Sequence, residues 1–177
     1  MREKHKELLE LLDKSGASLY TLLTRLTLRE DTAEELMQEL FIKLSNSRNF
    51  AKSNCPDAYA RRAAINLAFD WRRKFKQQVQ AQDFAYEVVS NDGSPLSKII
   101  RTEELEEMLN AIEKLNENRR QVIVMRYIQQ HSYDDISGQM GKTPHQVRAL
   151  CSKALNRLRE IMGTNNQKTS SKEKRNV

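Results

Sequence analysis

The sequence predicts an all-α fold made of two small helical domains. Three observations favour it: five glycines and three prolines occur among 177 residues, apolar residues recur at helical spacing, and almost no stretch alternates as a half-buried strand does. An apolar fraction of 38% beside 31% charged residues is enough for helical cores but leaves little for one deep core. No sheet is therefore expected.

The first predicted domain covers residues 1–76, and its clearest helix runs from Thr32 to Leu44. Thr32 followed by Glu35 has the spacing of a capping box, which predicts that the helix begins there. Apolar residues at three- and four-residue intervals form the stripe that would face the core. This stripe consists of Ala33, Leu36, Met37, Leu40, Phe41 and Leu44.

The outward face of that helix is acidic and rich in amides, although the protein is basic. Its residues are Glu34, Glu35, Gln38, Glu39 and Lys43. Such a face should repel DNA, so it is either a solvated helix surface or a surface for protein docking.

A second helix of this domain is predicted from Pro56 to about Phe75, because proline is accepted in the first helical turn. Its buried stripe consists of Ala60, Ala64, Leu67, Ala68 and Trp71. The residues predicted to lie outside that stripe are basic, and we expect their face to bind phosphates. They are Arg61, Arg62, Arg72, Arg73, Lys74 and Lys76.

Residues 77–100 are predicted to be a flexible linker, because the apolar pattern stops there and Gly93 and Pro95 break helices. Helical periodicity then returns, and a second domain is predicted over residues 101–162. Its apolar positions begin with Leu105, Met108, Leu109, Ile112 and Leu115 and continue with Val122, Ile123 and Met125. Residues 163–177 are polar and basic, which predicts a disordered tail.

Within the second domain, residues 132–158 contain the helix start and stop signals of a helix-turn-helix. A short helix that begins near Ser132 should end at Gly141, since glycine accepts the left-handed backbone of a tight turn. Thr143 can cap the next helix with its hydroxyl, and Pro144 suits its first position. The apolar stripe of this next helix, which would pack on Ile136 and Met140, consists of Val147, Cys151, Ala154 and Leu158.

The residues left outward on that helix are donors and small side chains, the set that can enter a major groove. They are Thr143 at the start, then His145, Gln146, Arg148, Ala149, Ser152, Lys153 and Arg157. Arg148 lies where a long side chain reaches a base edge, whereas Lys153 and Arg157 lie further along and are expected to meet phosphates. The alternative is an ordinary helical hairpin with a solvated basic face.

Charge and cysteine content narrow the class of protein. A net charge of +6 and a pI near 9.4 suit a polyanionic partner. Cys55 and Cys151 are distant and form no CxxC motif, so neither a disulfide scaffold nor a metal site is expected, and no cofactor is predicted. No apolar run approaches the roughly 20 residues that span a bilayer, which predicts a cytoplasmic protein that is neither exported nor inserted.

Two sets of motifs resemble the extracytoplasmic-function sigma factors, specificity subunits of bacterial RNA polymerase. The second conserved sigma region resembles AEELMQELF at Ala33–Phe41, and the helix that follows it in the family resembles INLAFDWRRK at Ile65–Lys74. The fourth sigma region is similar to the whole of Leu115–Glu160. Both sets occur in the family order with a suitable linker between them, which makes the resemblance more specific than either set alone.

The resemblance implies a partner for each surface. The family docks on core RNA polymerase through the residues matched by Glu34, Glu35, Gln38 and Glu39. The minus-ten element would be melted and held by Arg48, Asn49, Lys52, Asn54, Tyr59, Arg61, Arg62, Asn66, Arg72 and Arg73. The outward residues of the helix-turn-helix would read the minus-thirty-five element as duplex DNA, and an anti-sigma factor is a further candidate partner.

Two other classes of protein compete with this interpretation. A stand-alone helix-turn-helix regulator is favoured by Thr143–Arg159 but leaves the acidic face of 34–39 unexplained. A nucleic-acid enzyme lacks support, because we find no paired carboxylates in a cleft motif, no metal-ligand spacing and no phosphate-binding glycine loop. The sequence therefore predicts a promoter-recognition subunit that is not an enzyme.

Overall fold

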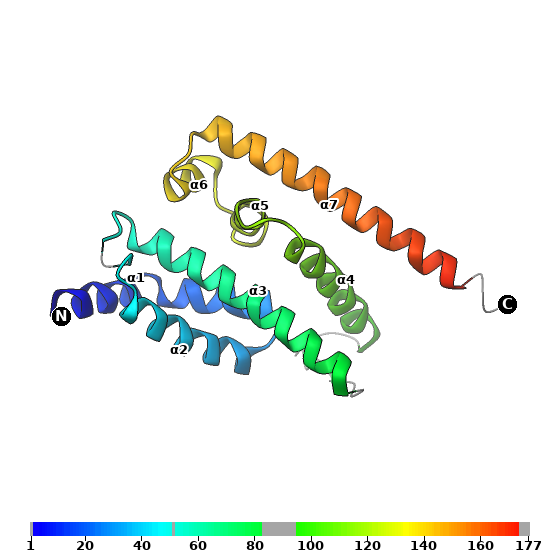
Figure 1. The fold of residues 1–177 in the computed structure, drawn as a ribbon, viewed down its shortest axis with the longest axis horizontal. Coiled ribbons are helices and arrows are strands. Elements are labelled where there is room, and N and C mark those ends of the chain that lie inside the picture. Colours follow the sequence, from blue (N-terminus) through cyan, green and yellow to red (C-terminus); the bar gives the residue numbers. More distant parts are fainter. Residues whose placement is uncertain (1, 51, 83–94, 174–177) are drawn as a thin grey trace. The chain divides into compact units, whose positions relative to one another are not determined.

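The computed structural model describes residues 2–50, 52–82 and 95–173, with side chains described for 6–50, 52–79 and 103–163. Every regular element in these ranges is a helix, which agrees with the predicted all-α fold. The chain divides into two compact units, Met1–Asp92 and Gly93–Val177. Figure 1 shows the helices of both units, coloured along the sequence.

The first unit is a bundle of three helices that all pack on one another: α1 (Arg2–Thr27), α2 (Glu30–Asn46) and α3 (Pro56–Gln82). Its core combines leucines of α1 and α2 with small residues of α3, so that the backbone of α3 can approach closely. Fully or almost fully buried members are Leu19, Leu22, Leu23, Leu26, Leu36, Leu40, Leu44, Ala60, Ala64 and Ala68. The predicted stripes of α2 and α3 are thus confirmed in their main members, while Met37, Phe41 and Trp71 are half-buried.

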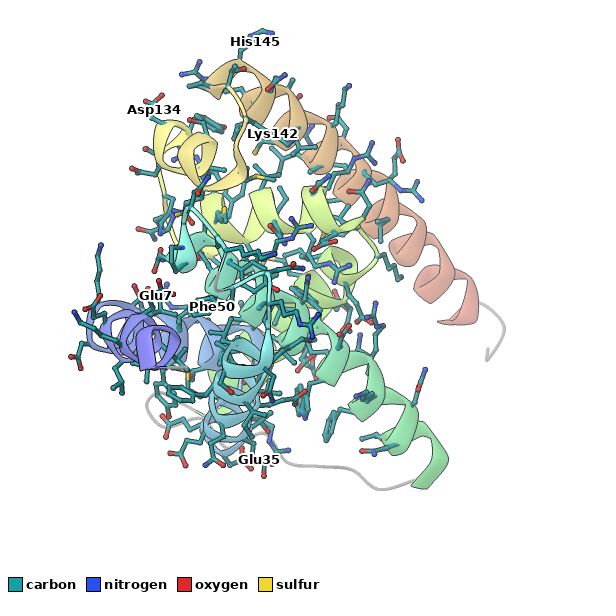
Figure 2. The ribbon with its side chains drawn as sticks, turned by 60° about the vertical axis from the view of Figure 1, so that its left-hand side comes forward. Glu7, Glu35, Phe50, Asp134, Lys142 and His145 are labelled. Atoms are coloured by element: carbon teal, nitrogen blue, oxygen red, sulfur yellow. The ribbon has the colours of Figure 1, made fainter. Side chains whose placement is uncertain are left out.

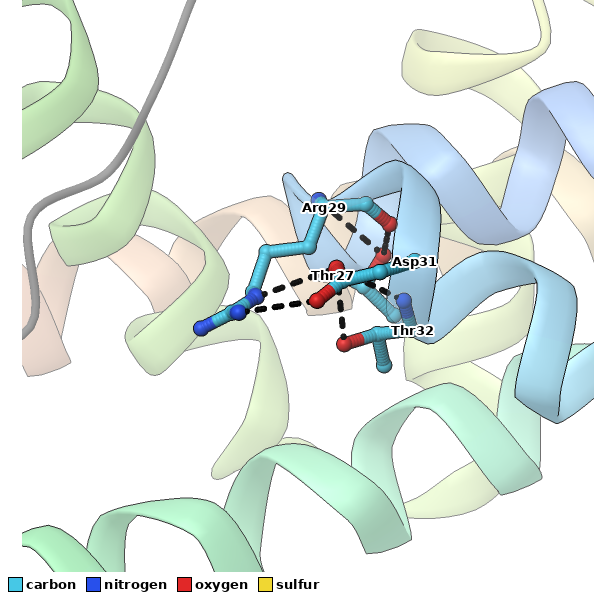
Figure 3. A network of polar contacts seen from close by, with 4 residues as sticks. All are labelled: Thr27, Arg29, Asp31 and Thr32. Carbon is cyan, nitrogen blue, oxygen red and sulfur yellow. Dashed lines mark hydrogen bonds and ion pairs between the residues drawn. The ribbon is translucent and has the colours of Figure 1, made fainter.

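The turn between α1 and α2 corrects the predicted start of α2. The helix begins at Glu30, and Thr32 is buried in its first turn and makes no capping box with Glu35. Asp31 instead accepts a hydrogen bond from the Thr32 N–H at 2.8 Å and pairs with Arg29 at 2.9 Å (Figure 3). The hydrogen bonds from Arg29 and Thr32 outweigh desolvation and hold the pKa of Asp31 below its ordinary value. Carboxylates in a first turn are favoured by the helix dipole, which explains the earlier start.

Two helix ends lie inside the segment predicted as a linker. Helix α3 continues to Gln82, seven residues past the predicted end at Phe75, and α4 (Pro95–Glu113) begins at the proline that was expected to break helices. Proline at a first helical position leaves no hydrogen bond unmade, so Pro95 starts a helix here. The rest of the predicted linker, residues 83–94, lies outside the described residues.

The second unit contains α4, α5 (Glu117–Ile123), a π-helical turn η1 (Val124–Ile128), α6 (Tyr133–Met140) and α7 (Pro144–Glu173). Asn116 caps α5 by accepting a hydrogen bond from the Arg119 N–H at 3.0 Å. The core lies between α4, α5, η1, α6 and α7. Its buried members include Leu109, Ile112, Leu115, Val122, Ile123, Met125, Ile136, Val147, Cys151 and Ala154. Leu105, predicted as an apolar core position, is exposed.

Helix α7 extends into the segment 163–177, which was predicted to be a disordered tail. Helix α7 does not stop near Met162 but continues through Gly163 to Glu173. An isolated glycine costs a helix only about 1 kcal/mol, and the preceding residues are already helical, so propagation past it adds one hydrogen bond for each residue fixed. Residues 174–177 lie outside the described part of the chain.

Candidate nucleic-acid interface

The helix-turn-helix is fixed by a cap at each of its boundaries. The Ser132 hydroxyl accepts from the Asp135 N–H at 3.1 Å, and the Asp135 carboxylate accepts from the Ser132 N–H at 3.2 Å, so α6 starts with a full capping box. Hydrogen bonds from the Ser132 hydroxyl and N–H lower the pKa of Asp135. At the other end Gly141 adopts φ 62° and ψ 37°, the left-handed conformation that the sequence predicts.

The start of α7 confirms the predicted cap and adds a partner. The Thr143 hydroxyl accepts from the Gln146 N–H at 3.2 Å, and the Gln146 side-chain oxygen accepts from the Thr143 N–H at 3.0 Å. Pro144 occupies the first helical position. The side-chain oxygen of Gln146 is thus engaged in the cap, which leaves its amide NH₂ group to donate outward.

The predicted outward face of α7 is exposed along its whole length. His145 projects from the N-terminal end of the helix, away from α6 (Figure 2). Val147, Cys151 and Ala154 are buried on the opposite side as predicted, while Leu158 and Met140 are half-buried. The exposed residues are Thr143, His145, Gln146, Arg148, Ala149, Ser152, Lys153 and Arg157, the last of which pairs with Glu160 at 2.8 Å.

In the first unit, the loop between α2 and α3 is held by one aromatic anchor. Phe50 is fully buried, its N–H donates to the Ser47 hydroxyl at 3.1 Å, and its ring lies 6.0 Å from that of Tyr59. The Ser47 and Tyr59 hydroxyls are hydrogen-bonded at 3.0 Å. This anchoring leaves the predicted DNA-binding residues of the loop exposed: Arg48, Asn49, Lys52 and Asn54.

The burial of Phe50 was not predicted, although the sequence contains a signal for it. Phe50 is an isolated large apolar residue in a segment that is otherwise polar, SNSRNFAKSNC. A single aromatic residue in such a loop commonly fills a satellite position of the core. Its burial anchors the first part of the loop, residues 47–50, on the bundle.

Four of the residues predicted on α3 share one helical face. Tyr59, Arg62, Asn66 and Arg73 are spaced by three, four and seven residues, which aligns them along one side of a helix. Arg62 and Arg73 are exposed, whereas Tyr59 and Asn66 are half-buried. Arg73 also pairs with Asp70 on the same face, an exposed contact that contributes little to stability.

Arg61 and Arg72 do not belong to this surface, which corrects their predicted position. They are only 6% and 3% exposed, and they lie eleven residues apart, three full turns, on the buried side of α3. Arg61 pairs with Asp57 at 3.0 Å, and Arg72 donates to the Leu26 carbonyl at the end of α1 at 3.2 Å. The Arg72 guanidinium therefore ties α3 to α1. Arg61 pairs within α3, with a carboxylate that also accepts a hydrogen bond from Ser15 of α1.

The acidic face of α2 is present as predicted. Glu35 points away from the bundle in Figure 2, and Glu34, Gln38 and Glu39 are exposed beside it. The structure adds Ile42, which is 61% exposed. Ile42 is seven residues from Glu35 and therefore lies in line with it on the same face. An exposed isoleucine in line with the acidic side chains was not predicted.

Two other features, a metal site and a membrane-spanning helix, are absent from the described residues. No group of three or more His, Cys, Asp or Glu side chains among them could hold a metal ion. In the same part of the chain, no helix is long and apolar enough to cross a membrane.

Comparisons with known proteins match both units. Residues 11–78 match the family model of Sigma-70 region 2, and residues 105–158 match that of Sigma-70, region 4. The ECF RNA polymerase sigma factor SigX of Bacillus subtilis (strain 168) is 24% identical over 160 residues, which cover 86% of this chain and 81% of SigX.

Two solved structures are also similar. The sigma factor RpoE, solved in complex with the anti-sigma factor NepR from Bartonella quintana, is 23% identical with a TM-score of 0.47 over 92% of this chain and 98% of its own. CnrH, solved in complex with the cytosolic domain of CnrY, is 17% identical with a TM-score of 0.49 over 90% of each chain.

The matched regions occupy most of both units, and region 2 precedes region 4 as the sequence motifs predicted. The acidic face of α2, the loop between α2 and α3, and the α3 face with Tyr59, Arg62, Asn66 and Arg73 all fall in the region 2 match. The capped helix-turn-helix falls in the region 4 match. The chain belongs to the sigma-70 family and is a sigma factor of the extracytoplasmic-function type, which directs RNA polymerase to promoters.

Proposed function

We propose that this sigma factor acts through three separate surfaces, one for core RNA polymerase and two for promoter DNA. The observation that carries the proposal is the division of charge within the first unit. One helix, α2, exposes carboxylates and an isoleucine, while the loop 47–55 and α3 expose cations and amides. A single polyanionic partner does not fit both surfaces, whereas a protein and a nucleic acid together do.

The polymerase-docking surface consists of Glu34, Glu35, Gln38, Glu39 and Ile42 on α2. Carboxylates beside an exposed aliphatic side chain offer charged and apolar contacts on one helix face, a combination that is typical of protein interfaces. The acidic rim favours a basic partner surface and disfavours DNA. Ile42 would supply the apolar burial, and the carboxylates would set partner choice and orientation.

The surface for the melted minus-ten element joins the loop to the face of α3. Exposed Arg48, Lys52, Arg62 and Arg73 provide cations for the backbone of a single strand. Asn49, Asn54, Tyr59 and Asn66 provide amide groups and one aromatic ring beside them, which suits an unstacked base. Arg61 and Arg72 are excluded from this surface because the bundle uses their guanidinium groups.

The surface for the minus-thirty-five element is the outward face of α7. We assign base reading to Arg148 and phosphate contacts to Lys153, with Arg157 as a further phosphate contact. The rest of this face is polar and narrow enough to enter a major groove. It consists of Thr143, His145, Gln146, Ala149 and Ser152. The chain is not an enzyme in this proposal, since each surface contributes binding free energy alone.

Transcription in vitro with core RNA polymerase and fragmented genomic DNA tests the proposal and finds its promoters. On the best promoter, Arg148→Ala should cost about 1–3 kcal/mol and relax discrimination at one or two upstream positions. Lys153→Ala should weaken all sequences alike and reduce the salt slope by about one unit. If both variants lose affinity uniformly with an unchanged upstream preference, α7 only positions the protein.

The docking surface needs a separate measurement with a matched control. Glu39→Lys should weaken binding to core polymerase while helical circular dichroism stays intact. Asp13→Lys reverses an exposed carboxylate on α1 and should leave that affinity unchanged. Equal affinities of the two variants for core would remove the docking assignment.

Partners and location follow from the same proposal. The protein would work in the cytoplasm, where polymerase and chromosomal DNA are found, and an anti-sigma factor remains a predicted partner. A stand-alone helix-turn-helix regulator would use α7 alone and would commonly form a two-fold dimer. Gel filtration of the free protein separates the two, because a sigma factor should elute as a monomer that enters a complex with core polymerase.

A further inference from the structure

Arg148 does not extend freely from α7 but lies against an aromatic ring. Its guanidinium carbon is 5.4 Å from the ring centroid of Tyr133, within the range of a cation–π contact. Arg126 approaches the same ring at 4.7 Å. One tyrosine of α6 thus contacts a cation of η1 and a cation of the DNA-facing helix.

The ring of Tyr133 is itself held at both ends. Its backbone begins α6 directly after the Ser132 cap, and its hydroxyl donates to the buried Cys151 sulfur at 3.9 Å. Arg126 is fixed independently, because it donates to the His131 carbonyl at 2.9 Å. The platform under Arg148 therefore has few alternative positions.

Position along α7 explains why Arg148 needs such support. Arg148 follows the fully buried Val147 and lies at the flank of the exposed face, whose centre is formed by His145, Ala149 and Ser152. From the flank, a flexible arginine reaches a base only in some of its rotamers, and restricting it on binding costs conformational entropy. A ring that holds the guanidinium beforehand removes part of that cost.

We propose that Tyr133 is a positioning residue for promoter reading, which orients Arg148 before DNA arrives. The proposal rests on the proposed function of Arg148 in reading the upstream element. Tyr133 itself need not touch DNA. It would act through the ring, so a phenylalanine should replace it, although the hydroxyl contact to Cys151 would be lost.

A double-mutant cycle in the polymerase holoenzyme tests this. Discrimination is measured by competition between the preferred promoter and promoters with single substitutions in the upstream element. Tyr133→Leu should lower discrimination about two- to fivefold, the factor of one exposed cation–π contact, and Tyr133→Phe should keep it. In the Arg148→Ala background, Tyr133→Leu should have no further effect.

The cycle separates the possible failures. A general loss of folding would weaken binding in both backgrounds, and Tyr133→Met provides a second apolar variant. Two results would overturn the positioning role. In the first, Tyr133→Leu lowers discrimination equally in both backgrounds. In the second, Arg148→Ala lowers discrimination but Tyr133→Leu does not change it, and base reading by Arg148 then stands. If Arg148→Ala keeps full discrimination, base reading by Arg148 and the role of Tyr133 fall together.

Discussion

The buried pair of Arg61 and Asp57 gives a quantitative prediction for the first unit. The Arg61 side chain is 7% exposed, and its Nε and Nη1 atoms have no hydrogen-bond partner among the described residues. Asp57 accepts hydrogen bonds from Arg61 and from the Ser15 hydroxyl of α1. Asp57→Ala would therefore leave a buried cation with no carboxylate at all.

The expected cost follows from the burial of the two partners. Breaking a buried ion pair costs about 3–5 kcal/mol, and the Asp57 side chain is 31% exposed, so solvent screening places the value at about 3 kcal/mol or slightly less. This is a large share of the roughly 5–15 kcal/mol that stabilises a domain. Arg61→Met should rescue most of the Asp57→Ala loss, because the double variant contains no buried charge. Arg61→Met alone should cost less than Asp57→Ala, because the remaining Asp57 carboxylate is 31% exposed and still accepts a hydrogen bond from Ser15.

Urea unfolding of the full chain measures these changes, since the single tryptophan, Trp71, lies on α3 and its fluorescence reports the first unit. The same Arg61→Met variant should retain promoter opening, because Arg61 is not on the DNA surface. A loss below about 1 kcal/mol for Asp57→Ala, or a failure of Arg61→Met to rescue it, would refute the reasoning.

The pH dependence has a definite sign. Burial raises the pKa of Asp57, but hydrogen bonds from Ser15 and Arg61 and the Arg61 charge outweigh it, so the pKa lies below its ordinary value. The unfolded chain thus binds the proton more readily, and the stabilisation is present above the unfolded pKa of about 3.9. It is lost as the pH falls below that value, so wild type and Asp57→Ala should converge in acid.

Three further substitutions test other parts of the structure. Ile42→Ser should weaken core polymerase binding by about 1–2 kcal/mol without loss of helicity, measured by fluorescence anisotropy; unchanged affinity would remove Ile42 from the docking surface. Phe50→Ala should cost the first unit about 3–5 kcal/mol in urea unfolding. Gly141→Ala meets no atom within 4 Å, so only its left-handed backbone should be penalised, by about 1–2 kcal/mol in thermal unfolding; a larger loss would indicate a packing role.

The helix-turn-helix was predictable to the residue because its signals are local. Ser132, Gly141, Thr143 and Pro144 each determine the backbone within three or four residues of themselves. The same reasoning failed at Thr32, where an apparent capping box competes with two carboxylates one and two residues earlier. Burial of Thr32 and the helix dipole at the first turn favour the start at Glu30, and a four-residue motif shows neither of them.

Contacts between residues far apart in the sequence could not be predicted, for a different reason. Ser15 and Asp57 are 42 residues apart, and Arg72 and the Leu26 carbonyl are 46 residues apart. An arginine beside alanines on a helix is usually a surface residue, since arginine is almost never fully buried unless paired. The partner of Arg72 is on another helix. Arg61 pairs with Asp57 on its own helix, but the burial of that pair against Ser15 of α1 is a long-range contact. The sequence pattern alone therefore assigns both arginines to the wrong side.

The separation of charge in the first unit predicts different salt dependences for its docking contact and its DNA contact. Exposed charges are screened over about 8 Å at physiological ionic strength, so the acidic face of α2 and the cations of loop 47–55 can act on different partners with little mutual cancellation. Added salt should therefore weaken both contacts, yet through different steps. The DNA contact releases counterions and follows a steep logarithmic dependence on salt, whereas docking centred on Ile42 retains its apolar part. At rising salt, a holoenzyme that still contains the sigma factor should lose promoter binding first, and dissociation of the sigma factor before loss of DNA would contradict an apolar centre in the docking surface.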